Sequence, residues 1–415
     1  MDGKDHQMNT TQSQSPSVKV FSRDDVRVAK RHTAKLLARA AANQKAGNRK
    51  SVRHMAVEYL RSHHARLLAA RRAYYALDRD DRPAIEQVAE VIKSLDAWQK
   101  SNEKVVVTAK WKDNGDYRAI SNFGFEHRTR QYLVADFLSS IAVLHPDQYG
   151  TRGGVPAAID RVSELLRTGY VWTIELDIAN CFPSFEGKNL HNFLPLPEKV
   201  IANSIMGNTL NVIPGDSLLK GFGPADDDPG NLLGLGEILA DARRGLPQGS
   251  AAASIVAEML IAVPLKTLPS VGWVPSYADN MLIMAKSEED AVSMSTALLS
   301  AFKAHPVGHL TPTLKSQSCP GQWVHFLGHC LRVDGQLVQI IPSAKNEAKF
   351  AKRMKAGLKS VGNTHLSGYV RRARARSVQR DIKSWTGNFS RCDGMKERKK
   401  HWLGKIDVAI GAISK

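Results

Sequence analysis

Two apolar segments constrain the fold most, one with an aspartate at its end and the other with an aspartate at its polar centre. The segment VWTIELD, residues 171–177, alternates so that its apolar side chains share one face of a β-strand and Asp177 lies at the end of the other face. The segment SYADNMLIM, residues 276–284, has a polar tip with Asp279 between apolar flanks, which predicts a buried hairpin. We expect these strands to lie side by side, with both aspartates facing one cavity.

Two carboxylates held this close repel each other unless cations lie between them. Hard oxygen ligands favour Mg²⁺, and two such ions about 3.5–4 Å apart can stabilise the attacking and leaving oxygens of phosphoryl transfer. We therefore predict that Asp177 and Asp279 hold two Mg²⁺ ions, with Mn²⁺ as a substitute. Taken singly, either residue would be an ordinary surface aspartate.

The charge distribution indicates a polyanionic partner. The chain of 415 residues has a net charge of +18, with +9 in residues 1–100, −5 in residues 101–344 and +14 in residues 345–415. Basic ends gain affinity for nucleic acid by releasing counterions from phosphates, and an acidic centre suits a metal site. A basic protein without such a partner is the alternative.

Cysteine usage and hydropathy favour a cytoplasmic protein without a membrane span. The four cysteines form no CxxC pair, which is typical of a reducing compartment. The most apolar run, residues 251–265, is short and interrupted by Glu258.

The order of elements along the chain predicts several units. Residues 1–18 are expected to be a disordered leader, and residues 23–77 have helical spacing and many arginines. Residues 104–125 contain an Asn-Gly turn between two strand-like runs and predict a β-hairpin. Residues 186–240, rich in Gly and Pro, are expected to be irregular, with the acidic run 226–228 in a solvated loop.

Several short segments between residues 104 and 330 occur in an informative order. They are RAI (118–120), QYGTR (148–152), DIANCF (177–182), GLPQGS (245–250), YADN (277–280), LKS (314–316) and FLG (326–328). This series resembles the motifs of reverse transcriptases, particularly the prokaryotic group of group II intron, retron and antiphage-defence enzymes. Each segment alone is weak evidence, whereas their combined order and spacing is specific.

The resemblance implies an α+β fold of the right-hand polymerase type, with fingers, an antiparallel palm sheet backed by helices, and a helical thumb. The expected divisions are a leader (1–18), a basic N-terminal helical region (19–100), fingers (101–170), palm (171–342) and a basic helical thumb (343–415).

The resemblance also assigns catalytic roles. Asp177 and Asp279 would bind the metal ions, with the backbone carbonyl of Ile178 as a further ligand. Asn280 stands where the family has a second aspartate; its amide oxygen can bind a cation but brings no charge, so metal should be held less tightly. Lys315 would protonate the leaving pyrophosphate, or else is a solvated lysine.

Further residues would bind the nucleotide. Phe182 resembles the aromatic gate that blocks a ribose 2′-hydroxyl and so favours deoxynucleotides; the alternative is a core aromatic. Lys112, or Lys110 in its place, would neutralise the triphosphate together with Arg118, unless these residues only form a charged hairpin. Gln248 and the backbone of Gly249 would support the incoming nucleotide and the template base.

The primer and the nucleic-acid backbone would contact two further groups of residues. The expected primer contacts are Tyr277, Phe326, Leu327 and Gly328, and the expected backbone contacts in the thumb are Arg371, Arg372, Arg374 and Arg376.

The predicted activity is RNA-directed DNA synthesis, in which a 3′-hydroxyl is extended with dNTPs on an RNA template to give a DNA product. By resemblance, the template would be a cognate noncoding RNA in antiphage defence. The alternatives are a catalytically weak or inactive RNA-binding scaffold, a template-independent nucleotidyltransferase and an RNA-synthesising polymerase. An oligomer or a second protein subunit is left open.

Overall fold

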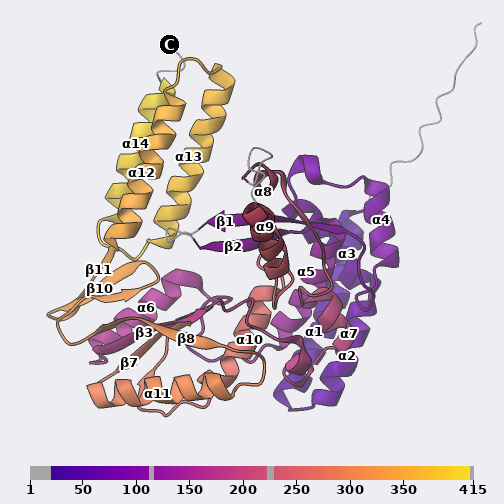
Figure 1. Cartoon of the computed structure of the whole chain (residues 1–415), viewed down its shortest axis with the longest axis horizontal. Helices are drawn as coiled ribbons and strands as arrows, with labels where there is room; N and C mark the ends of the chain where they lie inside the picture. The colour runs from indigo at the N-terminus through magenta and orange to yellow at the C-terminus, as the bar shows by residue number, and fades with distance from the viewer. Residues whose placement is uncertain (1–19, 112–115, 222–228, 412–415) are drawn as a thin grey trace, which may run out of the picture.

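The computed structural model describes residues 20–111, 116–221 and 229–411 (Figure 1). The predicted leader, Lys112 and the acidic run 226–228 lie outside the described residues. Within these residues the fold is a mixed α+β arrangement with three β-sheets and several groups of helices.

The arginine-rich N-terminal segment folds as separate helices. They are α1 (Arg23–Lys45), α2 (Arg49–Arg61), α3 (His63–Ala76) and α4 (Ile85–Ser94). Ser22 and Ser62 cap α1 and α3, because their hydroxyl groups accept hydrogen bonds from the backbone N–H groups of Asp25 and Ala65. Helix α5 (Phe125–Ile141) packs against this group and links it to the rest of the molecule.

The predicted hairpin is present as β1 (Lys104–Trp111) and β2 (Tyr117–Asn122). Strand β4 (Asn211–Pro214) pairs with β1 in parallel and completes a three-stranded sheet in the order β2-β1-β4. In Figure 1 the hairpin lies between the N-terminal helices and the C-terminal helices.

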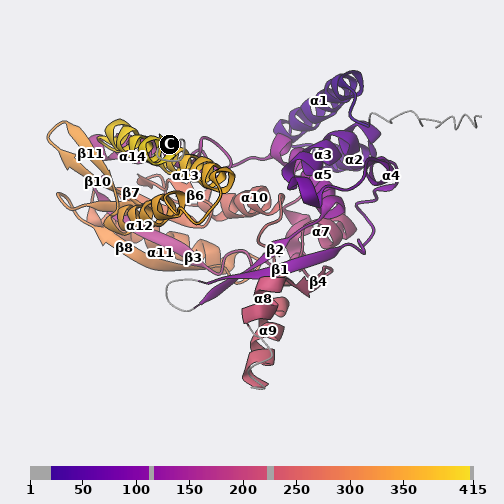
Figure 2. The same ribbon diagram turned by 90° about the horizontal axis from the view of Figure 1, so that it is seen from above.

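The prediction that residues 186–240 are irregular was wrong. This segment contains α7 (Glu198–Ser204), β4, α8 (Asp216–Gly221) and α9 (Pro229–Ala242), and Figure 2 shows α8 and α9 projecting from the body of the molecule. Glycine and proline lowered the local helix signal, but Ile238 and Ala242 are buried with the apolar side chains of the β2-β1-β4 sheet. Tertiary burial outweighs propensity here.

The central sheet has the order β5-β7-β3-β8 and is antiparallel, with β6 also paired to β7. Its strands are β3 (Trp172–Ala179), β5 (Gly272–Trp273), β6 (Ser276–Tyr277), β7 (Asn280–Ala285) and β8 (Thr311–Ser318). As the sequence predicted, β3 and the SYADNMLIM hairpin are neighbours, and Asp177 pairs with Asn280.

Both faces of β7 are buried, which explains its uninterrupted apolar sequence. Met281 and Ile283 join the main core with α5, α10 (Ala253–Leu265) and α11 (Glu288–Ala304). Leu282 and Met284 join a second core with α6 (Gly154–Arg167) and the last sheet. The hairpin tip that carries Asp279 is therefore anchored from two sides.

The C-terminal part begins with the sheet β9 (Val324–Phe326), β10 (His329–Asp334) and β11 (Leu337–Pro342). Helices α12 (Ala344–Val361), α13 (Gly368–Asn388) and α14 (Met395–Gly411) follow as a bundle with a small core of its own. Figures 1 and 2 show this bundle beside the central sheet and apart from the N-terminal helices. Among the described residues, no helix is long and apolar enough to cross a membrane.

Candidate functional site

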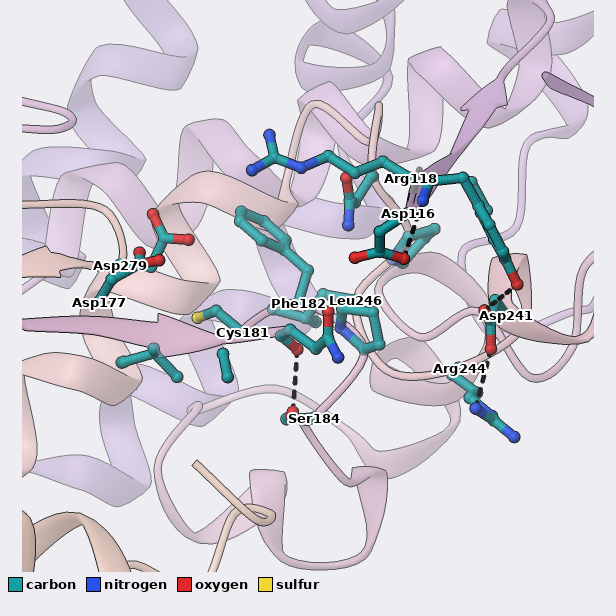
Figure 3. Close-up of a pocket in the computed structure, with 18 of the residues that line it drawn as sticks. Asp116, Arg118, Asp177, Cys181, Phe182, Ser184, Asp241, Arg244, Leu246 and Asp279 are labelled. Atoms are coloured by element: carbon teal, nitrogen blue, oxygen red, sulfur yellow. Dashed lines mark hydrogen bonds and ion pairs between the residues drawn. The ribbon is translucent and has the colours of Figure 1, made fainter. Parts of the chain in front are cut away.

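A cleft of about 790 Å³ lies where β2, β3, β8, the β6–β7 turn and the turn before α10 meet. Most of the predicted catalytic and nucleotide-binding residues line it: Arg118, Asp177, Ile178, Phe182, Gln248, Asp279, Asn280 and Lys315. Figure 3 shows Asp177 and Asp279 together at one end, Asp241 and Arg244 at the other, and Phe182 between them.

The sheet register brings the two aspartates together. The backbone N–H of Ile178, next to Asp177, donates to the carbonyl of Asp279 at 3.2 Å. Burial raises the pKa of Asp279 above its ordinary value, and the negative charge of Asp177 raises it further. Asn280 donates its side-chain amide to Oδ1 of Asp279 at 3.2 Å. The site therefore holds two carboxylates whose charges repel each other, with Lys315 paired to Asp177 at 2.9 Å and Asn280 hydrogen-bonded to Asp279.

The donor set fits Mg²⁺ better than a soft metal. Two carboxylates and the carbonyl of Ile178 are hard oxygen donors, and Mg²⁺ typically uses one or two carboxylates together with phosphate oxygens of the substrate. No group of three or more His, Cys, Asp and Glu side chains that could hold a metal occurs in the described part of the chain. Burial also raises the pKa of the Cys181 thiol in the same cleft, which disfavours a thiolate ligand.

Phe182 is held by the turn that contains Gly245. Its carbonyl accepts a hydrogen bond from Leu246 N–H at 2.9 Å, and its ring packs at the edge of the main core while lining the cleft. Gly245 has φ +56°, and a Cβ atom there would lie 2.1 Å from the Phe182 carbonyl oxygen. Only glycine permits this approach.

The same turn fixes β2. The backbone N–H of Ser121 donates to the carbonyl of Gln248 at 2.8 Å, and a Cβ atom at Gly249 would lie 2.3 Å from the Ser121 carbonyl oxygen. Arg118, three residues earlier in β2, lines the same cleft as Gln248. Gly249 does not line the cleft, but its lack of a side chain lets the turn lie close to the backbone of Ser121.

Sequence reasoning missed a polar network at the far end of the cleft. The Tyr117 hydroxyl donates to Oδ2 of Asp241 at 2.6 Å, and Arg244 pairs with Oδ1 of the same carboxylate at 2.8 Å. Burial, followed by the Asp241 hydrogen bond, raises the pKa of Tyr117. Arg244 directly precedes the GLPQGS segment, and this position could have indicated that Arg244 lies near the cleft. Nothing in the sequence links Arg244 or Asp241 to Tyr117.

The QYGTR segment supports the hairpin rather than lining the cleft. The backbone N–H groups of Tyr149 and Ser276 donate to the carbonyls of Ser276 and Asp147 at 2.9 and 2.8 Å. Thr151 donates its N–H to both carboxylate oxygens of Glu258 at 3.1 Å, and its hydroxyl also donates to this carboxylate. Glu258 is buried on α10, so the loop joins that helix to the β6–β7 hairpin.

Replacing Glu258 with Ala is expected to lower the free energy of unfolding by about 2–4 kcal/mol, because Thr151 loses its acceptor and a buried cavity remains. Urea unfolding followed by circular dichroism measures this change. Glu90→Ala, at an exposed position of α4, is the control and should cost less than about 0.5 kcal/mol. Similar losses in both variants would contradict the assignment.

The predicted primer and backbone contacts lie away from the cleft lining. Tyr277 is half-buried in β6, and Phe326 is buried. Leu327 and Gly328, with φ of +47° and +78°, form the β9–β10 turn and line a separate cavity against α12 and α13.

The four arginines predicted to contact the nucleic-acid backbone all lie on α13. Arg372, Arg374 and Arg376 are exposed, whereas Arg371 is half-buried and donates to the Val361 carbonyl at 2.7 Å. Arg374 also donates to the Ser360 hydroxyl. Arg371 therefore joins α13 to α12, and the exposed members of the group are available to a ligand.

No protein-family model matches the chain, and no curated protein is found to be similar to it. Among solved structures, it is similar to telomerase from Candida albicans in complex with a TWJ fragment of telomeric RNA, at 12% sequence identity and a TM-score of 0.36. The similarity covers 76% of this chain and 61% of that chain.

Proposed function

We propose that this protein is an RNA-directed DNA polymerase. The observation that carries the proposal is the cleft itself, where Asp177 of β3 and Asp279 of the adjacent β6–β7 turn lie together with Arg118 and Gln248 in the lining. On this proposal, residues 101–170 are the fingers, residues 171–342 the palm and residues 343–415 the thumb. Basic side chains at both ends of the chain would hold the RNA template and DNA product.

Each cleft residue has a defined part in the proposed reaction. Asp177, Asp279 and the Ile178 carbonyl would hold two Mg²⁺ ions, which supply charge stabilisation for attack of a primer 3′-hydroxyl on the α-phosphate of a dNTP. Arg118 would bind the triphosphate with its guanidinium donors, and Gln248, in the turn that is hydrogen-bonded to the same strand, would orient the nucleotide. Lys315 would give a proton to the departing pyrophosphate.

Phe182→Ala is expected to raise the use of ribonucleotides relative to deoxynucleotides by about tenfold or more, because the ring would no longer exclude a 2′-hydroxyl. Competition between labelled NTPs and dNTPs measures the ratio. Phe193→Ala is the control, since Phe193 packs against the same core outside the cleft. Unchanged sugar discrimination in Phe182→Ala would remove the gate assignment.

Primer extension tests the proposed function directly. Purified protein would be incubated with Mg²⁺ or Mn²⁺, labelled dNTPs and an RNA template bearing a DNA or RNA primer. Incorporation that follows the template sequence supports the proposal. Incorporation without template indicates a terminal transferase, preferential incorporation of NTPs indicates an RNA polymerase, and binding without incorporation contradicts catalysis.

One observation favours a second candidate, a non-catalytic RNA-binding scaffold. Protein groups already contact both carboxylates: Lys315 contacts Asp177, and Asn280 contacts Asp279. A scaffold would bind the primed RNA in the same assay and incorporate no nucleotide with either metal.

The biological setting of the proposal rests on the motif resemblance. On this basis the protein would be a cytoplasmic enzyme that acts with a cognate noncoding RNA in antiphage defence. It would act alone, as an oligomer or with a second protein subunit. Sequencing the RNA and DNA that co-purify with the protein from cells would identify the template and product.

A further inference from the structure

Lys315 occupies an irregular position in β8. Glu175 of β3 pairs with Ser316, but the next residue, Leu176, pairs with Leu314, so Lys315 is an extra residue without a partner in β3. This arrangement is a β-bulge, which bends a strand and redirects the side chain at the inserted position. Bulges of this kind are frequent beside functional sites.

The bulge directs the Lys315 side chain toward Asp177. Its Nζ lies 2.9 Å from Oδ2 of Asp177, and the two side chains are 49% and 23% exposed. The strand is fixed on both sides of the bulge: the Thr313 hydroxyl donates to the Asp177 carbonyl at 3.0 Å, and the Ser316 hydroxyl donates to Oε2 of Glu175 at 2.8 Å. The ammonium group is thus held at this carboxylate by the local backbone.

We propose that Lys315 is a built-in counter-ion of Asp177 that competes with divalent cations for this carboxylate. The inference rests on the proposed metal site. A cation that binds Oδ2 must displace the ammonium group, and a cation bound elsewhere on the carboxylate is repelled by it. Lys315 therefore weakens metal binding in the absence of substrate.

The same ion pair connects the two roles proposed for Lys315, counter-ion of Asp177 and proton donor to the leaving pyrophosphate. While it neutralises Asp177, its protons are engaged at the carboxylate. Once metal replaces it there, the ammonium group becomes available to the phosphates of a nucleotide in the same cleft. Metal binding would thereby release the residue that the proposed reaction uses as a proton donor.

Titration of the full-length protein with Mn²⁺, without nucleotide or nucleic acid, tests the inference. The electron paramagnetic resonance signal of free Mn²⁺ gives the dissociation constant. Lys315→Met should bind Mn²⁺ about tenfold more tightly than the wild type, because it loses both the competing ion pair and the repulsion. Lys315→Arg keeps a cation and should remain within about twofold of the wild type.

Lys303→Met is the control for net charge, since Lys303 is exposed on α11 outside the cleft and its loss should leave Mn²⁺ affinity unchanged. Circular dichroism would verify folding, and Lys315→Gln replaces Lys315→Met if the latter is unfolded. Unchanged or weaker binding in the folded variant overturns the inference, as does the absence of Mn²⁺ binding in every variant. Tighter binding by a protein that incorporates no nucleotide would support the counter-ion and contradict only the polymerase.

Discussion

Asp177→Asn and Asp279→Asn are each expected to lower the rate of DNA synthesis at least about a thousandfold. Each change removes a charged metal ligand, and a loss of about 4 kcal/mol of transition-state stabilisation corresponds to three powers of ten. Single-turnover primer extension at saturating dNTP measures the rate. Asp334→Asn, at an exposed position at the end of β10, is the matched control and should retain full activity.

Asp279→Asn is expected to raise stability while it removes activity. Burial and the charge of Asp177 raise the pKa of Asp279, so the folded protein holds the proton more tightly than the unfolded chain. The stabilisation from protonated Asp279 is complete at a pH below the pKa of aspartate in the unfolded chain. It is lost as the pH rises through the higher pKa that Asp279 has in the folded protein. The variant has no such group, so its stability advantage should grow with pH across this interval.

Thermal unfolding of the wild type and the variant in a chelating buffer, at a series of pH values, measures the difference. Titrating groups far from Asp279 contribute equally to both proteins and cancel, whereas the interaction of Asp279 with Asp177 belongs to the measured difference. A variant that is both inactive and less stable at neutral pH would show that Asp279 is a structural residue, and the charge argument would fail.

Gly245→Ala is expected to lower the free energy of unfolding by more than about 3 kcal/mol and to abolish nucleotide incorporation. The added Cβ would lie 2.1 Å from the carbonyl oxygen of Phe182 and 2.8 Å from the backbone of Pro183, and backbone atoms cannot move aside as a flexible side chain can. The turn would have to shift, and Phe182 and Gln248 would shift with it. Urea unfolding and primer extension measure the two effects.

Gly335→Ala is the control that has the backbone strain of Gly245→Ala without its steric contact. Gly335 has φ +61°, close to the +56° of Gly245, but a Cβ atom added there would meet no atom of the described residues within 4 Å. Its replacement should cost only the left-handed strain of about 1–2 kcal/mol and leave incorporation unchanged. Equal losses in the two variants would show that the Phe182 contact is unimportant.

The sequence predicted individual elements best where one local pattern dominated. The alternation in residues 171–177 identified β3, and the two strand-like runs around an Asn-Gly turn in residues 104–125 identified β1 and β2. The prediction failed for α9, because the buried apolar side chains of this helix pack in one cluster with residues of β1 and β4 that are distant in the sequence. Propensity alone cannot detect a partner that lies elsewhere in the chain.

The amino-acid sequence alone was enough to select the candidate catalytic residues: one aspartate on a strand, one at a hairpin tip, an arginine in a hairpin, and glycines in a turn before a helix. Only the tertiary structure decided that Asp177 and Asp279 share one cleft, that Lys315 is turned toward Asp177 by a bulge, and that Tyr117 and Asp241 hydrogen-bond across 124 positions of the chain. The physical reason is that strand register and long-range packing depend on which surfaces meet. A local pattern shows which face of a helix or strand is apolar, but it does not show which other element packs against that face.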